Sequence, residues 1–333
     1  MNPLRLPACV VWSLALVASA AAAAPPPQEK PRLPEGPDGL AAKHPGDAGI
    51  ENHPAVLFVE KFDEESREAL FKRWETVVRK DDLSFSDDVP AGSADGRSLL
   101  ITHVGGRGEG GQLYRRLPPG HDRVFARFYV KFDPGCAPVH HFGTHLGGFH
   151  PSTAWPQGGA GERPAGNKRF TTGVEPNGDR WQWDFYTYWQ GMHRHGDGRY
   201  WGTPFLAEAP KPAVERGKWI CVEMMVKLND PAGSDGEQAF WIDGKLWRVG
   251  DRVVSHIGKG FPQGRWRGGW WGPDADSPTG FEGFRWRTVK ELAVNYVWTY
   301  VYITKAPAGH VSRVWFDNIV IAKEYIGPIQ PAK

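Results

Sequence analysis

The sequence predicts an all-β sandwich that occupies most of the 333 residues. After residue 55, apolar and polar residues alternate along most segments, as in strands that bury one face. Gly, Pro, Asn and Asp separate these segments at short intervals, which is typical of sandwiches. Helical spacing occurs at SREALFKRW (66–74), where one short helix is expected. Residues 55–330 are expected to form a single β domain, a common length for one sandwich.

The first 24 residues have the pattern of a signal peptide. Arg5 precedes an apolar run that starts near Ala8, and small residues follow up to Ala24. The run is short for a membrane span. We expect cleavage near Ala20–Ala24, a secreted or periplasmic protein, and no membrane attachment after cleavage. Residues 25–54 are rich in Pro, Gly, Ala and charge, and we predict that they form a disordered linker.

Composition narrows the possible partners. The formal net charge is +2, so the chain has no overall attraction for nucleic acid. Cys136 and Cys221 lie outside the leader and either pair in an oxidising compartment or remain two buried thiols. The chain contains 16 Trp, 17 Phe and 9 Tyr. These rings either fill a large core or offer flat platforms for sugars. A monomer is expected.

Two predicted strands carry functional groups opposite a core face. Along VFARFYVKF (124–132), the apolar row that includes Phe128 faces the core, while Arg127 and Lys131 face the other way. Along RWQWDFYTYWQ (180–190), tryptophan and phenylalanine form the core row. The opposite row offers a hydrogen-bonding group at every position: Gln182, Asp184, Tyr186, Tyr188 and Gln190.

Three later segments complete the predicted sandwich. WICVEMMVKLN (219–229) directs Glu223 and Lys227 away from its core row, and QAFWIDGKLW (238–247) contains an Asp-Gly hairpin signal. RVWFDNIVIA (313–322) is typical of a central strand. NYVWTYVYIT (295–304) places four aromatic residues in one row, which is either a sugar platform or half of the core: Tyr296, Trp298, Tyr300 and Tyr302. The polar and aromatic rows together predict a concave groove that a chain-like ligand would fill.

Four histidines fall within VHHFGTHLGGFH (139–150): His140, His141, His145 and His150. The spacings between successive histidines are 1, 4 and 5, HLGG will not hold a helix, and HExxH and Cys-x-x-Cys patterns are absent. The sequence therefore predicts no transition-metal site and no required cofactor. A structural calcium ion remains possible, because spacing does not reveal sites built from backbone and Asp oxygens.

Hydrolytic mechanisms find little support in the sequence. A Gly-x-Ser-x-Gly elbow is absent. Glycoside hydrolysis needs two carboxylates across the scissile bond, and Asp184 and Glu223 are the candidates. We favour the alternative that these two carboxylates form ion pairs with Arg127 or Lys227.

β-Elimination on a uronic-acid polymer requires neither a metal nor paired carboxylates. One group must neutralise the uronate carboxylate, a base must remove the C5 proton, and an acid must protonate the leaving oxygen. Arg, His, Asn or Gln suit the first role, His, Lys or Tyr the second, and Tyr the third. The predicted groove supplies these residue types: Arg127, Lys131, Gln182, Tyr186, Tyr188 and, in the next loop, His145.

Four segments follow one another in the order FARFYVKFDPGCAPVHHFGTHLGG, GGAGERPAGNKRFTTGVEP, DFYTYW and WICVEMMVKLNDPAGSDGEQAFWIDGK. In this order they resemble the jelly-roll polysaccharide lyases of the alginate and glucuronan type, most of all family 14. The resemblance covers about residues 120–245 and, more weakly, VWFDNIVIA (314–322). It implies a concanavalin-like β-jelly roll that cleaves polyuronates.

The resemblance also implies site residues. Tyr186 and Tyr188 match the family's Tyr-x-Tyr pair on a groove strand. THLGG (144–148) resembles the family's Gly-Gly-Lys-Leu-Pro-Gly stretch, with His145 where the family has a lysine. Two features depart from the family: RFTTGVEP has no equivalent of the Ser-x-Arg strand, and the aromatic row at 295–304 replaces the Phe-Gly-Gly ending.

The resulting hypothesis is a secreted polysaccharide lyase that acts on an anionic, uronic-acid-containing glycan. Tyr186 or Tyr188 is the acid and a candidate base, and His145 is the alternative base or the carboxylate partner. Arg127 or Arg169 holds the uronate. Other substrate contacts are expected from Lys131, His140, His141, Gln182, Asp184, Gln190, Trp298 and Tyr300. The alternatives are a non-catalytic carbohydrate-binding protein and, third, the hydrolase considered above.

Overall fold

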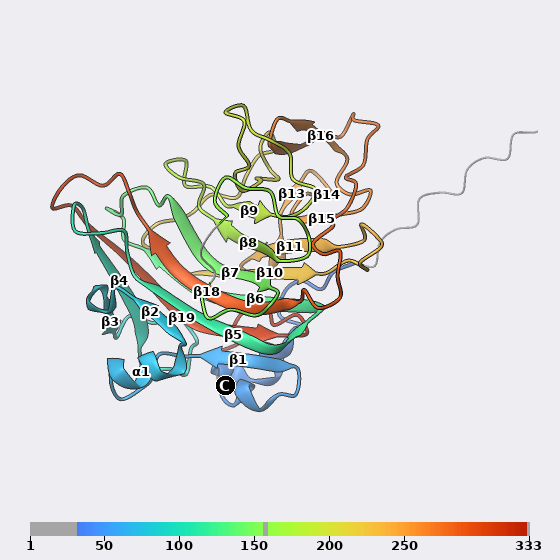
Figure 1. The fold of residues 1–333 in the computed structure, drawn as a ribbon. Coiled ribbons are helices and arrows are strands. Elements are labelled where there is room, and N and C mark those ends of the chain that lie inside the picture. Colours follow the sequence, from blue (N-terminus) through green and yellow to red (C-terminus); the bar gives the residue numbers. More distant parts are fainter. Residues whose placement is uncertain (1–31, 156–158, 332–333) are drawn as a thin grey trace, which may run out of the picture. The chain divides into compact units, whose positions relative to one another are not determined.

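The computed structural model describes residues 32–155 and 159–331 (Figure 1). The chain divides after Leu33 into two units, and the fold described below is that of the second, Pro34–Lys333. The predicted signal peptide, residues 1–24, lies outside the described residues. In the described part of the chain, no helix is long and apolar enough to cross a membrane.

Two large antiparallel sheets form the body of the second unit in the described part of the chain. The larger sheet has nine strands: β1 (Val56–Glu60), β3 (Leu83–Ser86), β4 (Ser98–Val104), β6 (Arg123–Phe132), β10 (Ile220–Lys227), β11 (Glu237–Ile242), β12 (Lys245–Leu246), β15 (His256–Gly258) and β19 (Val311–Ala322). Their order is β12-β11-β10-β6-β19-β4-β3, with β1 paired to β19 and β15 to β11. The smaller sheet has six: β2 (Thr76–Val78), β5 (Gln112–His121), β18 (Val294–Tyr302), β7 (His141–Phe149), β8 (Arg169–Glu175) and β9 (Asp184–Tyr188), in that order.

Short elements complete the unit. Two hairpins pair β13 (Arg248–Val249) with β14 (Arg252–Val253) and β16 (Gly264–Arg267) with β17 (Trp270–Pro273). The helix predicted at 66–74 is α1 (Arg67–Arg73). It begins there because the Ser66 hydroxyl accepts a hydrogen bond from the backbone N–H of Ala69, at 3.1 Å. Four 3-10 turns are also present among the described residues: η1 (Leu40–Lys43), η2 (Pro45–Asp47), η3 (Ile50–Asn52) and η4 (Lys80–Asp82).

The core lies between the two sheets. From the larger sheet, Phe128 and Phe132 on β6 and Phe316 on β19 meet Phe142 on β7 of the smaller sheet. The rings of Phe142 and Phe316 stack at 5.3 Å between centroids, and both side chains are fully buried. Burying one such ring contributes about 1.5–3 kcal/mol. The predicted all-β sandwich is therefore confirmed, and the alternating rows of 124–132 are the reason that it forms.

The segment predicted as a disordered linker, 25–54, needs correction where the structure describes it. The turns η1 to η3 bury Leu40, Ala41 and Ile50. The backbone N–H groups of Leu40 and Ala41 donate to the carbonyls of Tyr325 and Ile326, at 3.0 and 2.9 Å. Composition alone does not predict that this segment is ordered. It is ordered because its few apolar residues are buried together and its backbone forms hydrogen bonds with the C-terminal segment.

The two cysteines outside the leader do not pair with each other. Cys136 and Cys221 are free thiols within the described residues, and both are buried. Burial raises the pKa of each thiol well above its usual value, to about 12 for Cys136. Of the two alternatives left open by the sequence, the structure has two buried, unreactive thiols.

Candidate functional site

Glycines on one face of the smaller sheet let larger side chains lie flat across it. Gly143 and Gly147 of β7 stand opposite Tyr300 and Tyr296 of β18. A Cβ atom at Gly147 would lie 2.2 Å from the Tyr296 hydroxyl, and one at Gly173 of β8 would lie 1.8 Å from the His145 ring. These positions therefore require glycine, because any other residue would displace the ring above it.

A buried carboxylate holds two histidines on this face. Glu175, the last residue of β8, accepts a hydrogen bond from His145 Nε2 at 3.1 Å and from His141 Nδ1 at 3.3 Å. Burial alone would raise the pKa of Glu175, but the charges and hydrogen bonds of His141 and His145 hold this pKa at about 2. Glu175 is therefore an anion at neutral pH and fixes both rings.

The Glu175 contacts determine which nitrogens carry hydrogen. An ionised carboxylate can only accept, so His145 Nε2 and His141 Nδ1 are the donors. In the neutral rings, the free lone pairs are then on His145 Nδ1 and His141 Nε2. His145 Nδ1 is buried and has no hydrogen-bond partner among the described residues. The arrangement matches an oriented histidine base, in which a carboxylate fixes the tautomer.

Tyrosines surround the two histidines. The hydroxyls of Tyr186 and Tyr188 on β9 are 3.5 Å apart, and the Tyr186 ring lies 4.5 Å from that of His141. The Tyr300 ring contacts His145 edge-on at 5.2 Å. Burial raises the pKa of Tyr186, and Tyr188 and Glu175 raise it further; burial and Glu175 do the same for Tyr300. Tyr186 and Tyr300 therefore stay protonated at neutral pH and can donate a hydrogen.

Exposure separates the reachable members of this group from its supports. The His141 side chain is 25% exposed and Tyr186 is half-buried, whereas His145 retains 2%. Tyr188 and Tyr300 are also buried. We call the set Glu175, His141, His145, Tyr186, Tyr188 and Tyr300 the cluster. His141 and Tyr186 are open to a ligand on this face, while the buried Glu175 holds the His141 and His145 rings.

Comparisons with known proteins identify the fold. No family model matches the sequence, and no curated protein matches it. The similar solved structures include two alginate lyases. The marine PL-14 alginate lyase from Aplysia kurodai has a TM-score of 0.52 and 13% identity, and the match covers 80% of this chain and 98% of that one. A mutant of alginate lyase Aly36B in complex with an alginate tetrasaccharide has a TM-score of 0.50 and 14% identity, covering 83% and 99%. The fold is that of the jelly-roll alginate lyases. The resemblance noted in the sequence is thereby confirmed for the fold.

Several predicted site residues meet on one face of this alginate-lyase fold. His140 is exposed, stacks on His141 at 4.4 Å and bonds to Thr304. Trp298 stacks on Tyr300 at 4.1 Å and is half-buried, so the aromatic row lies outside the sandwich core. Arg169 starts β8, and its guanidinium lies 5.8 Å from the Tyr188 ring centroid.

Arg127 and Lys131 need correction as site residues. Arg127 is fully buried and paired with Asp47, and Lys131 pairs with Asp88. The strand faces were assigned correctly, but β6 belongs to the larger sheet and β9 to the smaller one. Because the two sheets pack core to core, their polar faces point to opposite sides of the sandwich. The predicted groove cannot combine them.

Asp184 and the two glutamines also have structural partners. Asp184 is buried, accepts the backbone N–H groups of Phe205 and Leu206, and pairs with Lys211 at 2.8 Å. Gln190 donates to the carbonyl of Ala165 at 3.1 Å. Gln182 lies before β9, in a β-bridge to Ala213.

The hydrolase alternative loses its carboxylate pair. Asp184 lies on β9 of the smaller sheet and Glu223 on β10 of the larger sheet. Glu223 accepts the backbone N–H groups of Ile326 and Gly327, both at 2.8 Å. The two carboxylates thus hold the chain together in separate places and do not face a common bond.

The sequence left open a structural calcium ion, which oxygen ligands would bind. Within the described residues, no three His, Cys, Asp or Glu side chains form a metal-binding group. Asp317 Oδ2 and Asn318 Oδ1 are nevertheless buried without a hydrogen-bond partner among those residues. Asn318 donates to Asp95 at 2.6 Å. Burial, together with the charges of Asp95 and Asp63, raises the pKa of Asp317 to about 9. Oxygens of this kind suit calcium, and the ion stays a prediction.

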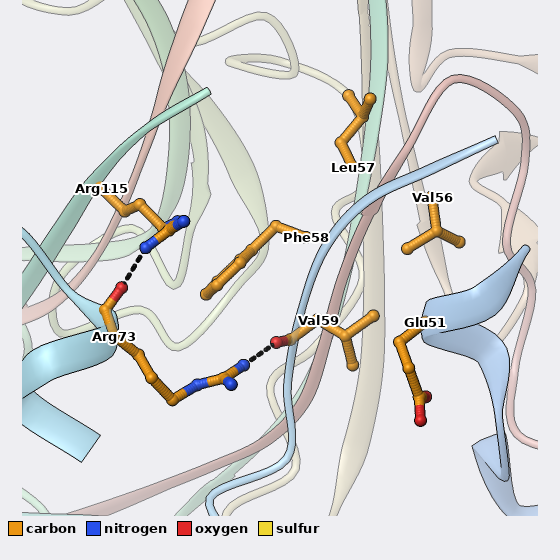
Figure 2. Close-up of a pocket in the computed structure, with 7 residues that line it drawn as sticks. All are labelled: Glu51, Val56, Leu57, Phe58, Val59, Arg73 and Arg115. Carbon is orange, nitrogen blue, oxygen red and sulfur yellow. Dashed lines mark hydrogen bonds between the residues drawn. The ribbon is translucent and has the colours of Figure 1, made fainter. Parts of the chain in front are cut away.

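A pocket of about 340 Å³ lies elsewhere, lined by β1, Arg73 of α1 and Arg115 of β5 (Figure 2). Figure 2 shows Phe58 between the two arginines. Arg73 is already paired with Glu60 and Glu64, at 2.9 and 2.8 Å, and Arg115 donates to the Arg73 carbonyl. The pocket contains no residue of the cluster, and its cations serve the local packing.

Glu175 is the site residue that sequence reasoning missed. A usable signal was present, because alternation along RFTTGVE places Glu175 on the same face as Thr171 and Gly173. A carboxylate at the end of a strand, next to a glycine in the same outward-facing row, is a candidate functional group. It was overlooked because no neighbouring base is visible in sequence, and the histidines come from another strand.

Proposed function

We propose that the protein is a secreted polysaccharide lyase that cleaves an anionic, uronic-acid-containing polysaccharide by β-elimination. The supporting observation is the buried Glu175, which orients two histidines beside protonated tyrosines on one face of an alginate-lyase fold. This set contains a base and an acid of the types that elimination requires. Export depends on the leader at 1–24, which sequencing of the mature N-terminus would test.

The cluster suits the two proton transfers as follows. His141 Nε2 carries the free lone pair and takes the C5 proton of the uronate, while Glu175 stabilises the resulting imidazolium. The C4–O4 bond breaks as the C4–C5 double bond forms. Tyr186 gives its proton to O4 and regains one from His141, whose ring lies 4.5 Å away. His145, which the sequence offered as base, is buried and acts as a positioning residue.

Substrate binding uses the residues around the cluster. Arg169, beside Tyr188, supplies a cation for uronate carboxylates, and Trp298 supplies a partly exposed ring for stacking. Protonated Tyr186 also donates a hydrogen bond to a carboxylate before the reaction. The polymer would then run along the outer face of the smaller sheet.

The experiment measures the ultraviolet absorbance of unsaturated uronate with alginate, glucuronan and glycosaminoglycans as substrates. The expected result is a rising signal with at least one polymer, lost in Tyr186→Phe and retained in Tyr302→Phe. Tyr302 of β18 also stacks on His141, with 5.9 Å between the ring centroids, but its hydroxyl donates to Glu109, so its variant is a matched control. Saturable binding without any product would instead support the non-catalytic carbohydrate-binding alternative.

A further inference from the structure

A pocket of about 460 Å³ adjoins the cluster at the end of β7 and the start of β8. Its lining includes Phe149, Trp155, Arg163, Lys168 and Arg169. Arg169 connects it to the cluster through Tyr188, and Trp155 connects it to the aromatic row, with its ring 5.7 Å from that of Trp298. A ligand that passes over the cluster can therefore continue into this pocket.

The pocket has excess positive charge. Three cations line it, Arg163, Lys168 and Arg169, and none forms an ion pair with a carboxylate of the described residues. The lining contains one carboxylate, Glu162. Arg169 donates to the backbone carbonyls of Gly159 and Glu162, at 2.9 and 3.1 Å. Burial lowers the pKa of Arg169, because the loss of hydration destabilises the charged guanidinium more than the neighbouring Tyr296, Glu162 and Tyr188 stabilise it. An anion beside this guanidinium would compensate that loss.

A second arginine pair extends the positive charge beyond the pocket. Arg163 and Arg194 lie over the same Tyr200 ring, 5.6 and 5.5 Å from its centroid. Neither has a carboxylate partner in the part of the chain that the structure describes. Two like charges on one ring repel each other, so a bound anion between or beside them would stabilise the arrangement.

We infer that this pocket is a subsite for a second acidic sugar of the same polymer, one that is not cleaved. The inference rests on the proposed function and narrows its substrate to chains with acidic groups beyond the reacting uronate. Arg169 and Gly173, the position beneath His145, are four positions apart along β8, which corresponds to about 13 Å. The group bound by Arg163 and Lys168 is a carboxylate or a sulfate, and Trp155 provides the ring on which its sugar stacks.

The test compares two variants that each lose two positive charges. In Arg163→Gln/Lys168→Gln the charges come from the pocket, and in Lys290→Gln/Arg313→Gln they come from exposed positions elsewhere. Isotherms are measured with uronate oligosaccharides of increasing length, with sulfated chains and with neutral chains. For long acidic chains we expect roughly tenfold weaker binding in the pocket variant, as for the loss of two exposed charge contacts. Short acidic chains, neutral chains and the control variant should show no change.

The outcomes separate this inference from the proposed function. If long acidic chains bind the pocket variant as tightly as the native protein, the subsite is excluded, even when unsaturated product forms. If binding weakens as expected but no polymer yields product, the lyase proposal fails and the subsite stands. If no acidic chain binds the native protein, the subsite is excluded whatever the products show. A stronger effect on uronates than on sulfated chains, or the reverse, identifies the anionic group.

Discussion

Replacing Glu175 by Gln tests the centre of the site, because it removes the charge and keeps the shape. The interactions of Glu175 with His141 and His145 overcome its burial and lower its pKa from 4.5 to about 2. This difference corresponds to about 3 kcal/mol in favour of the ionised, folded state. Because the folded-state pKa is lowered, this stabilisation is present above pH 4.5 and is lost as the pH falls toward 2.

We expect Glu175→Gln to lower the free energy of unfolding at pH 7 by up to about 3 kcal/mol. We also expect a loss of at least about 100-fold in kcat, since His141 loses the group that orients and stabilises it. Urea unfolding and initial rates of product absorbance measure the two effects. Glu109→Gln, at an exposed carboxylate that bonds to Tyr302, is the control. A Glu175→Gln variant with native stability and native kcat would refute the reasoning.

Three further outcomes follow from the same geometry. Tyr186→Phe should lower kcat by about 100-fold or more with little change in KM, because it removes a proton donor and keeps the ring; an unchanged kcat would exclude Tyr186 as the acid. Gly173→Ala should lower the free energy of unfolding by about 1–3 kcal/mol, because the new Cβ would clash with the His145 ring. Thermal unfolding measures this effect, and an unchanged Tm would contradict the placement of the His145 ring over Gly173. If calcium binds at Asp317, whose Oδ2 is buried without a hydrogen-bond partner among the described residues, adding calcium should raise the Tm of the native protein but not that of Asp317→Ala. Equal shifts of the Tm in both proteins would show that calcium binds at another place.

The sequence predicted the fold because each long strand follows a simple rule of alternation. Phe128 and Phe132 of one strand and Phe316 of another pack in the core as their rows predicted. The aromatic row of β18 could not be placed from sequence, because both faces of that segment are apolar enough to be buried. Pairing with β5 and β7 decided it.

The site was predictable only in part. Alternation along a strand predicts which side chains share a face, but it does not predict to which sheet the strand belongs. His145, Tyr186 and Tyr188 do share one face, and the tyrosines share one strand. Arg127 was placed with them because its row is polar, yet its strand belongs to the opposite sheet, where Asp47 holds it. Glu175 depends on two histidines from β7 that approach it only after the strands pair. Such contacts between strands have no signature in a single sequence.

The most direct test of an eliminative mechanism is the fate of solvent oxygen during cleavage. The native protein is incubated with an acidic polysaccharide in heavy-oxygen water, and the new chain ends are analysed by mass spectrometry. β-Elimination breaks the C4–O4 bond without adding water, so we predict products with a C4–C5 double bond. We also predict no solvent oxygen in them when the reducing ends are reduced with borohydride before they exchange oxygen with the solvent. Products that lack this double bond and together gain one solvent oxygen per broken linkage would show hydrolysis and contradict the roles assigned to His141 and Tyr186.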